Sequence, residues 1–122
     1  MDDRADLGRV GEKQAAKFLR RKRYRIVTRN YRCPMGELDL IALDGKIIVF
    51  VEVKTRTDSE HADPEENVNL AKQQRISRCA EFFLRQTGSD DRQCRFDVIA
   101  ITMNHNTKME IEHFMDAFTP AR

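Results

Sequence analysis

The sequence is short of the features that mark membrane, secreted and zinc-binding proteins. Its longest apolar run covers only residues 47–51, far below the roughly 18 residues that a membrane span needs. The acidic start at residues 1–3 has no apolar stretch behind it, so we expect no signal peptide. The three cysteines are odd in number and never form a C-x-x-C pair, which argues against a disulfide framework or a zinc site. We therefore expect a cytoplasmic protein without a membrane partner.

The three histidines also lack any spacing typical of metal ligands or of a nucleophile's base. We interpret His61, His105 and His113 as surface or loop residues. The sequence contains no internal repeat and no low-complexity segment.

With 122 residues, the chain suits one domain spanning 1–122 and is too short for a barrel of roughly 250 residues. Its formal net charge of +2 conceals an asymmetry. Residues 1–32 contain 11 basic and 4 acidic side chains, whereas residues 33–122 contain 11 and 16. A basic segment beside an acidic body indicates a polyanionic partner and a place where carboxylates are concentrated.

The hydrophobic periodicity predicts an α/β fold. Helical spacing of Leu7, Val10, Ala15, Phe18 and Leu19 predicts a helix over residues 5–22, with Asp6 as its N-cap. Further patterns predict strands at 24–29, 37–43, 46–54, 95–101 and 108–114, and a helix at 68–86. Residues 57–67 form a polar, acidic loop. The resulting order is α-β-β-β-α-β-β, a mixed β-sheet flanked by helices.

The strands at 37–43 and 46–54 are expected to form a hairpin, because Asp44-Gly45 favours a two-residue type I′ turn. This turn places Leu43 opposite Lys46, so that Asp39 and Glu52 become diagonal neighbours, roughly 7–8 Å apart at the backbone. The opposite face of the hairpin is apolar and is expected to be core. It carries Leu38, Leu40, Ala42, Ile47, Val49, Val51 and Val53.

Asp39, Glu52 and Lys54 are the candidate catalytic residues. Two carboxylates at diagonal positions can both reach one hard cation, and Mg²⁺ suits a site that leaves room for water and phosphate oxygens. Lys54 follows on the same side and can orient or deprotonate a water, or neutralise transition-state charge. The spacing D-x12-E-x-K is thus compatible with phosphodiester hydrolysis. E-x-K also occurs on strands by chance, as an ordinary solvated face.

Several motifs, in this order, cover the chain nearly end to end. They are Gly11-Glu12, Arg29-Asn30-Tyr31-Arg32, Gly36-Glu37-Leu38-Asp39-Leu40-Ile41, Val49-Phe50-Val51-Glu52-Val53-Lys54-Thr55-Arg56, Lys72-Gln73-Gln74-Arg75-Ile76, Arg95-Phe96-Asp97-Val98 and Ala117-Phe118. Together they closely resemble the YraN-type bacterial family, which is similar to the PD-(D/E)XK nuclease superfamily and to Holliday-junction resolvases. Leu38 stands where the superfamily signature often has Pro.

The resemblance implies a restriction-endonuclease-like fold in which Asp39, Glu52 and Lys54 form the catalytic core, with Mg²⁺ or Mn²⁺ as the cofactor. Glu12 matches an extra acidic residue that helps to bind metal or to position water. Resolvases make two symmetric cuts, so the resemblance also implies a homodimer.

A set of basic side chains is expected to contact phosphates, with DNA rather than RNA as the nucleic acid. The set is Arg20, Arg21, Lys22, Arg23, Arg25, Arg29, Arg32, Arg56 and Lys72. No segment is typical of a base-edge reader, so we expect recognition of shape or backbone. The alternative is a solvated helix end, where basic side chains favour the helix dipole. Tyr24 either stacks on a base or packs in the core.

Other polar residues have two interpretations each. Glu37 either supports the site from outside the catalytic core or only balances Lys54. Gln73, like Lys72, either faces the site from the helix start or lies in an ordinary exposed first turn. Asp97 is expected to pair with Arg95 or a neighbouring residue for structural reasons. Asn30 is expected to close a turn.

Three functions follow from these observations. The first is a metal-dependent nuclease acting on DNA, including branched or structured forms. The second is a non-catalytic nucleic-acid-binding module that retains the nuclease fold. The third is an adaptor that binds another protein through the acidic loop, at residues 58–66.

Overall fold

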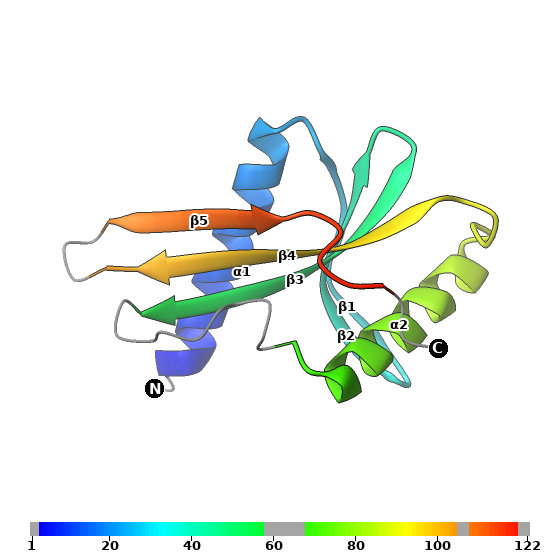
Figure 1. Ribbon diagram of the computed structural model, residues 1–122, viewed down its shortest axis with the longest axis horizontal. Helices are drawn as coiled ribbons and strands as arrows, with labels where there is room; N and C mark the ends of the chain where they lie inside the picture. The colour runs from blue at the N-terminus through cyan, green and yellow to red at the C-terminus, as the bar shows by residue number, and fades with distance from the viewer. Residues whose placement is uncertain (1–2, 58–67, 105–107, 120–122) are drawn as a thin grey trace.

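The computed structural model describes residues 3–57, 68–104 and 108–119, with side chains from residue 8 onward. It is a mixed five-stranded sheet with a helix on each face (Figure 1). The elements are α1 (Asp3–Arg21), β1 (Arg25–Cys33), β2 (Gly36–Asp44), β3 (Ile47–Thr57), α2 (Leu70–Gln86), β4 (Cys94–Met103) and β5 (Met109–Phe114). This order confirms the predicted α-β-β-β-α-β-β arrangement. Of the predicted acidic loop, Thr57 belongs to β3, and 58–67 lie outside the described residues.

The strands lie in the order β1-β2-β3-β4-β5. β3 and β4 are parallel, and the other neighbouring strands are antiparallel. Parallel neighbours need a crossover connection, and α2 lies within the crossover between β3 and β4. The predicted edge position of the last strand is confirmed, because β5 ends the sheet in the described part of the chain.

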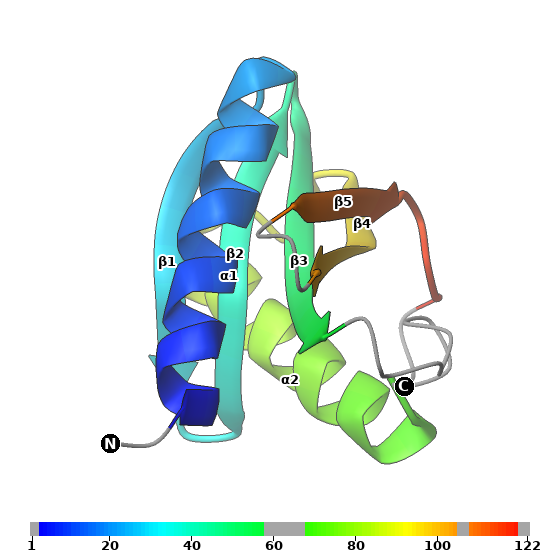
Figure 2. The same cartoon turned by 90° about the vertical axis from the view of Figure 1, so that its left-hand side faces the viewer.

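Each face of the sheet is covered by one helix, as Figure 2 shows for α1. Ala15, Ala16 and Leu19 of α1 pack on one face, against a cluster that includes Leu40 and Val49. The inward residues of α2 cover the other face, on Ile41, Ile48 and Phe50. These residues are those predicted for the second helix: Ile76, Cys79, Ala80 and Phe83. Val68 is buried as predicted, but it precedes the helix, whose N-cap is Asn69.

The predicted register of the β2–β3 hairpin is wrong by two residues. Asp44 pairs with Ile47 and Leu43 with Ile48, so the connection is made by Gly45, at φ 61°, and Lys46. Asp44 is part of β2 through its backbone pairing with Ile47, and its carboxylate accepts a hydrogen bond from Arg95 Nη1 at 3.1 Å. A shift of two residues preserves which side chains face the same way, since the side-chain period of a strand is two.

Leu38 does not share a face with Leu40, contrary to the prediction. It packs in the cluster under α2, whereas Leu40 packs under α1. The interruption coincides with Asn30, which lies in β1 between the pairs Tyr31–Leu38 and Arg29–Leu40 and has a left-handed φ of 53°. A left-handed residue bends a strand locally. Asn30 therefore lies inside β1. The prediction that it closes a turn is wrong.

The first helix approaches the sheet more closely than its predicted apolar face suggests. α1 begins at Asp3, so Asp6 lies within it, and Val10 is 44% exposed. From residue 8 onward, where its side chains are described, the buried residues of the helix are Gly11, Ala15, Ala16 and Leu19, so the predicted Ala15 and Leu19 are buried and three of these four residues are small. A Cβ added at Gly11 would overlap the Thr55 hydroxyl of β3. Only glycine lets the helix backbone approach β3 at this point.

Neither described helix is long and apolar enough to cross a membrane.

Candidate functional site

The candidate site lies where β2 separates from β3. The described β2–β3 pairs end at Leu40–Val51, whereas β2 stays paired with β1 as far as Gly36. β3 likewise stays paired with β4 as far as Thr57. Figure 1 shows the β1–β2 hairpin and the β3–β4–β5 part of the sheet running in different directions beyond this point. The next residue on each strand after the last pair is a carboxylate, Asp39 on β2 and Glu52 on β3.

The Asp39 side chain occupies the start of this opening. Its Oδ2 accepts a hydrogen bond of 2.8 Å from the Val53 backbone N–H. The carboxylate thus bonds to the β3 backbone beyond the last described β2–β3 pair, and this bond holds Asp39 beside Glu52. The observed register makes the two carboxylates closer neighbours than the predicted diagonal arrangement.

The environment of Asp39 strongly disfavours its ionised form. Burial, followed by the nearby Glu52 carboxylate, raises the pKa of Asp39 to about 8. The Val53 hydrogen bond opposes this shift, and the Glu12 carboxylate adds to it. A divalent cation would stabilise carboxylates held in this way, because it supplies the positive charge that they lack.

Glu52 is the most enclosed member of the site and is only 7% exposed. Its Oε1 lies 2.6 Å from Lys72 Nζ and 3.8 Å from Lys54 Nζ. Lys54 comes from the same strand, two residues on, whereas Lys72 comes from the first turn of α2. The crossover helix thus brings a second ammonium to the carboxylate that the E-x-K motif already pairs with a lysine.

The pKa values of the two lysines shift in opposite directions. Burial and the adjacent Lys72 ammonium lower the pKa of Lys54. Burial also tends to lower the pKa of Lys72, but its ion pair and hydrogen bond with Glu52 outweigh burial and raise it. Lys54 is therefore the easier of the two to deprotonate, which suits a group that takes a proton from water.

Glu12 approaches the site from α1. The contact between Gly11 and Thr55 brings this part of the helix against β3, and the Glu12 charge reaches Asp39. A hollow of about 420 Å³ opens beside Glu12. Its lining consists of Gly8, Arg9, Glu12, Asn30, Arg32 and Glu37.

The donor set of Asp39 and Glu52 fits a hard divalent cation with few protein ligands. Among the residues that the structure describes, no three His, Cys, Asp or Glu side chains are close enough together to hold a metal ion. A cation held by Asp39 and Glu52 would have these two carboxylates as ligands and would complete its shell with oxygens of water or phosphate. Mg²⁺ is commonly bound in this way, by one or two carboxylates plus substrate phosphates.

The two predicted supporting residues have identifiable partners. Gln73 Nε2 donates to the Val68 carbonyl at 2.8 Å, which fixes the start of α2 and so the helix turn that carries Lys72. Glu37 lies at the open end of β2, and its Oε2 is 3.7 Å from Arg32 Nε. Both of these side chains are largely exposed, and the pair is not a contact with Lys54.

The predicted phosphate-binding residues fall into separate places. Arg20, Arg21 and Arg23 are exposed around the C-terminal end of α1, and Arg25, Arg29 and Arg32 are exposed on β1. Lys22 differs from its neighbours, because its Nζ lies 2.8 Å from His113 Nδ1 and above the rings of Phe18 and Tyr24. Arg56 Nε donates to Thr102 Oγ1 at 3.2 Å. Lys72, also in the predicted set, is paired with the Glu52 carboxylate of the site.

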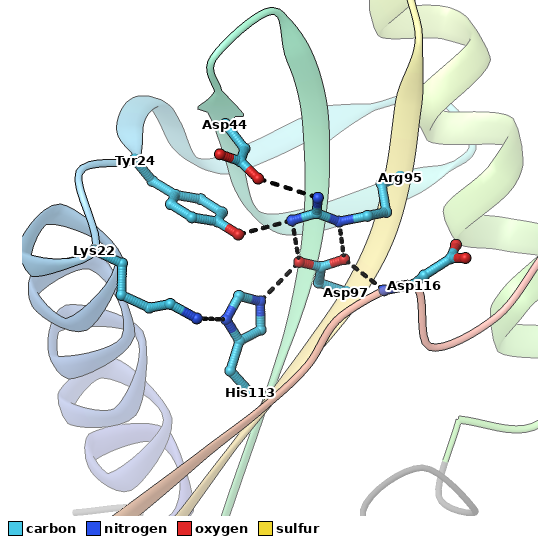
Figure 3. Close-up of polar contacts among 7 residues, drawn as sticks. All are labelled: Lys22, Tyr24, Asp44, Arg95, Asp97, His113 and Asp116. Atoms are coloured by element: carbon cyan, nitrogen blue, oxygen red, sulfur yellow. Dashed lines mark hydrogen bonds and ion pairs between the residues drawn. The ribbon is translucent and has the colours of Figure 1, made fainter.

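A buried polar network that the sequence only partly indicated lies away from the carboxylates (Figure 3). Asp97 is fully buried and accepts hydrogen bonds from Arg95 Nε and Nη2, at 2.8 and 2.9 Å. This confirms the predicted structural pairing of Asp97 with Arg95. His113 Nε2 lies 2.7 Å from the same carboxylate and the Asp116 backbone N–H donates to it at 2.9 Å. Arg95 also donates to the buried Tyr24 hydroxyl at 2.8 Å.

The prediction that His113 is a surface or loop residue is wrong, since its side chain is only 4% exposed. Its position in an alternating edge strand gave no indication that Asp97 of β4 lies next to it. His61 and His105 are outside the described residues.

A model of a protein family, described as "Uncharacterised protein family UPF0102", matches residues 11–101. A UPF0102 protein of Pelotomaculum thermopropionicum is 42% identical over 118 residues, covering 96% of this chain and 98% of the relative. One of Geotalea uraniireducens is 47% identical over 120 residues, covering 96% and 94%. Another, of Geobacter sulfurreducens, is 48% identical over 112 residues, covering 92% and 88%. The chain belongs to the UPF0102 family.

Proposed function

We propose that this protein is a metal-dependent nuclease that hydrolyses phosphodiester bonds in DNA, including branched or structured forms. Asp39 and Glu52 bind Mg²⁺ or Mn²⁺, and Lys54 assists the attacking water. The observation that carries this proposal is the meeting of the two carboxylates at the point where the sheet splits, with Lys54 Nζ 3.8 Å from Glu52 Oε1.

The role of each residue follows from its surroundings. Glu52 lies beside the Lys54 side chain and orients it. The lowered pKa of Lys54 makes its neutral amine easier to form, and that amine is the form that can accept a hydrogen bond and then a proton from water. Asp39 is held in place by Val53 N–H and is the carboxylate that most needs a positive partner. Glu12 adds a further carboxylate near the opening, where it can position water.

When bound, the divalent cation would polarise the scissile phosphodiester and stabilise the negative charge that develops in the transition state. Lys54 would add to this stabilisation once it has taken up the proton of the water, because the ammonium formed in this way lies in a partly buried site where electrostatic interactions are stronger than in water.

The resemblance to the YraN-type family, and through it to PD-(D/E)XK nucleases and Holliday-junction resolvases, supports the same assignment residue by residue. The resemblance assigns the site to Glu12, Asp39, Glu52 and Lys54. Their meeting at one place in the fold is consistent with a restriction-endonuclease-like arrangement. Two symmetric cuts across a junction would need two copies of the site, so the proposal includes a homodimer, which light scattering of the full chain checks.

Substrate binding is assigned to the exposed basic side chains of α1 and β1. Arg20 lies eight residues after Glu12 on the same helix, which corresponds to about 12 Å along the axis. Arg20, Arg21 and Arg23 can therefore contact phosphates at some distance from the scissile bond. Contacts of this kind supply affinity that depends on salt and not on base sequence.

The alternative is a nucleic-acid-binding module without catalysis. Its supporting observation is that Lys72 and Lys54 both pair with Glu52, so that the Glu52 carboxylate has positive partners within the chain itself. This alternative predicts binding that persists, and cleavage that is absent, in every divalent cation tested.

The deciding experiment is a cleavage assay on single strands, flaps and four-way junctions with Mg²⁺ or Mn²⁺. Asp39→Asn and Lys54→Met should abolish cleavage while leaving binding of the junction in place. Glu110→Gln, an exposed carboxylate on β5, serves as the matched control and should cleave like the wild type. Equal residual activity in the wild type and in both site variants would identify a contaminating nuclease and overturn the proposal.

A further inference from the structure

Lys72 occupies an unusual position for a helix-start lysine. Its Nζ is 2.6 Å from Glu52 Oε1, closer than Lys54 is to the same oxygen. Neither the E-x-K spacing nor hairpin geometry requires this contact, since Lys72 arrives from α2 after the crossover. The Asn69 cap, whose Oδ1 accepts from Lys72 N at 2.9 Å, fixes the helix turn that brings it there.

A divalent cation and the Lys72 ammonium compete for the same carboxylate oxygen. A magnesium ion lies about 2.0–2.1 Å from a ligating oxygen. The Lys72 ammonium lies 2.6 Å from Glu52 Oε1. A magnesium ion bound to this oxygen would therefore lie at most roughly 4.7 Å from the ammonium, even with the two cations on opposite sides of the oxygen. Like charges this close in a partly buried site repel strongly. Cation binding through this oxygen therefore favours departure of Lys72.

The structure offers Lys72 a place to go. A hollow of about 280 Å³ borders the site and is lined by Gly36, Glu37, Lys72, Arg75 and Ile76. Arg75 follows Lys72 by three residues, so the two cations lie on neighbouring positions of the same helix surface. The Lys72 side chain is 31% exposed and already lines this hollow, so it can turn outward without crossing the core. The hollow also has one carboxylate in its lining, Glu37, which pairs with Arg32. Lys72 and Arg75 outnumber it, so the lining carries net positive charge, which suits a nucleic-acid phosphate.

We propose that Lys72 is an exchangeable counter-ion of Glu52. It pairs with Glu52 while no divalent cation is bound, and it moves to a phosphate of the nucleic acid, beside Arg75, when a cation binds Glu52. This inference rests on the proposed function and adds a regulation of the same site. The divalent cation and the nucleic acid then bind cooperatively through Lys72, and each strengthens binding of the other by the same factor.

The first test measures Mn²⁺ binding to the full chain by calorimetry. Lys72→Met should bind Mn²⁺ on the order of tenfold more tightly than the wild type, within the usual range of coupling between sites. Arg78→Met removes a positive charge two turns along α2, at an exposed position, and should leave the affinity unchanged. If Lys72→Met folds poorly, Lys72→Gln keeps a hydrogen-bonding group without the charge and should show the same gain.

Thermal unfolding supplies a second readout that a merely structural role would not produce. In EDTA, Lys72→Met should melt below the wild type, because buried Glu52 loses its closer partner. Saturating Mn²⁺ should raise its melting temperature by more than it raises that of the wild type, because tighter binding stabilises the folded state more. A structural role alone would lower the melting temperature equally with and without the ion.

The nucleic-acid step is tested by the salt dependence of binding to a four-way DNA junction with phosphorothioate linkages. With Mn²⁺, Lys72→Met should reduce the slope of log affinity against log salt by about one. In EDTA the slope should be the same as in the wild type, since Lys72 is then paired with Glu52. An equal reduction in both conditions would contradict the exchange.

The outcomes separate this inference from the function on which it rests. Equal or weaker Mn²⁺ binding by Lys72→Met, in a wild type that binds Mn²⁺ and cleaves DNA, overturns the exchange and leaves the nuclease intact. Absence of Mn²⁺ binding in both proteins, with no cleavage, overturns both.

Discussion

The buried carboxylate of Asp97 holds together parts of the chain that are far apart in sequence. It accepts hydrogen bonds from Arg95 on its own strand and from the Asp116 backbone beyond β5, and His113 Nε2 lies 2.7 Å away. Through Arg95 it is linked to the Tyr24 hydroxyl at the start of β1. Figure 3 shows the group converging on this single side chain. Asp97→Asn is therefore expected to destabilise the whole fold.

The size of the effect follows from what asparagine leaves behind. The variant removes the fully buried one of the two negative charges that face Arg95 and leaves the more exposed Asp44 carboxylate, 3.1 Å from Nη1, as the remaining ionic partner. Breaking a buried ion pair from one side costs about 3–5 kcal/mol. The asparagine amide also presents N–H donors where the carboxylate had acceptors for Arg95 and His113. For a chain of this length the loss corresponds to a decrease in melting temperature of roughly 10–20 °C.

Urea unfolding at neutral pH, followed by circular dichroism, measures this loss. Asp116→Asn is the matched control, because the network uses the backbone N–H of Asp116, and asparagine tolerates its left-handed φ of 53°. Its free energy of unfolding should equal that of the wild type. A loss below about 1 kcal/mol for Asp97→Asn would refute the reasoning, since that is no more than one ordinary hydrogen bond contributes.

The same variant tests the pH dependence. Burial alone would raise the pKa of Asp97, but the hydrogen bonds from His113, Arg95 and the Asp116 N–H together lower it. A carboxyl whose pKa is lower in the folded than in the unfolded chain contributes its full stability above about pH 4 and loses it as the pH falls through the folded pKa. The wild type should therefore lose stability on acidification, and Asp97→Asn should lose less.

Three further predictions concern the site and its approach. Asp39→Asn should stabilise the metal-free protein at pH 9 but not at pH 4, because a folded pKa of about 8 makes the ionised carboxylate costly as the pH rises; urea unfolding in EDTA measures this. Gly11→Ala should cost about 1–3 kcal/mol, because its Cβ overlaps the Thr55 hydroxyl, and adding Thr55→Ala should restore part of the loss. Lys22→Met should mainly lower the melting temperature, because Lys22 Nζ contacts His113, whereas Arg23→Met should mainly lower the affinity for the DNA junction.

Each of these predictions has a result that would contradict it, and the Gly11 prediction also has a control variant. For Gly11, the control is Gly8→Ala, since nothing lies within 4 Å of a Cβ added there. That variant should be neutral or should stabilise α1 by about 0.5–1 kcal/mol. A loss equal to that of Gly11→Ala would contradict the close approach of α1 to β3. Equal stability of Asp39→Asn and the wild type at both pH values would contradict the raised pKa of Asp39. A loss of junction affinity for Lys22→Met as large as that for Arg23→Met would show that Lys22 binds phosphate.

Several features of the fold could be predicted because they depend on local periodicity. The order of helices and strands and the inward residues of α2 follow from apolar spacing alone. The pairing of Arg95 with Asp97 was also accessible, since residues two apart on a strand point the same way. Asp39, Glu52 and Lys54 were identified as a site because charges on an otherwise apolar hairpin face need a compensating partner.

Other features depend on contacts that local pattern does not encode. The predicted hairpin register is wrong by two residues because Asp44 extends β2 and pairs with Ile47. The Asp44 carboxylate also has a partner, Arg95, fifty-one residues later in the chain. Leu38 changes face where Asn30 bends the neighbouring strand. His113 is buried because Asp97 lies next to it across β4 and β5.

The sequence by itself determined the order of the elements, most of the apolar face of the central hairpin and the charged residues on its other face, because these are properties of spacing along the chain. Only the tertiary structure decided that the strands separate at Asp39 and Glu52 and that α2 brings Lys72 to the same carboxylate. The physical reason is that a buried charge takes its partners from whichever elements pack around it. Packing joins residues that spacing along the chain leaves far apart.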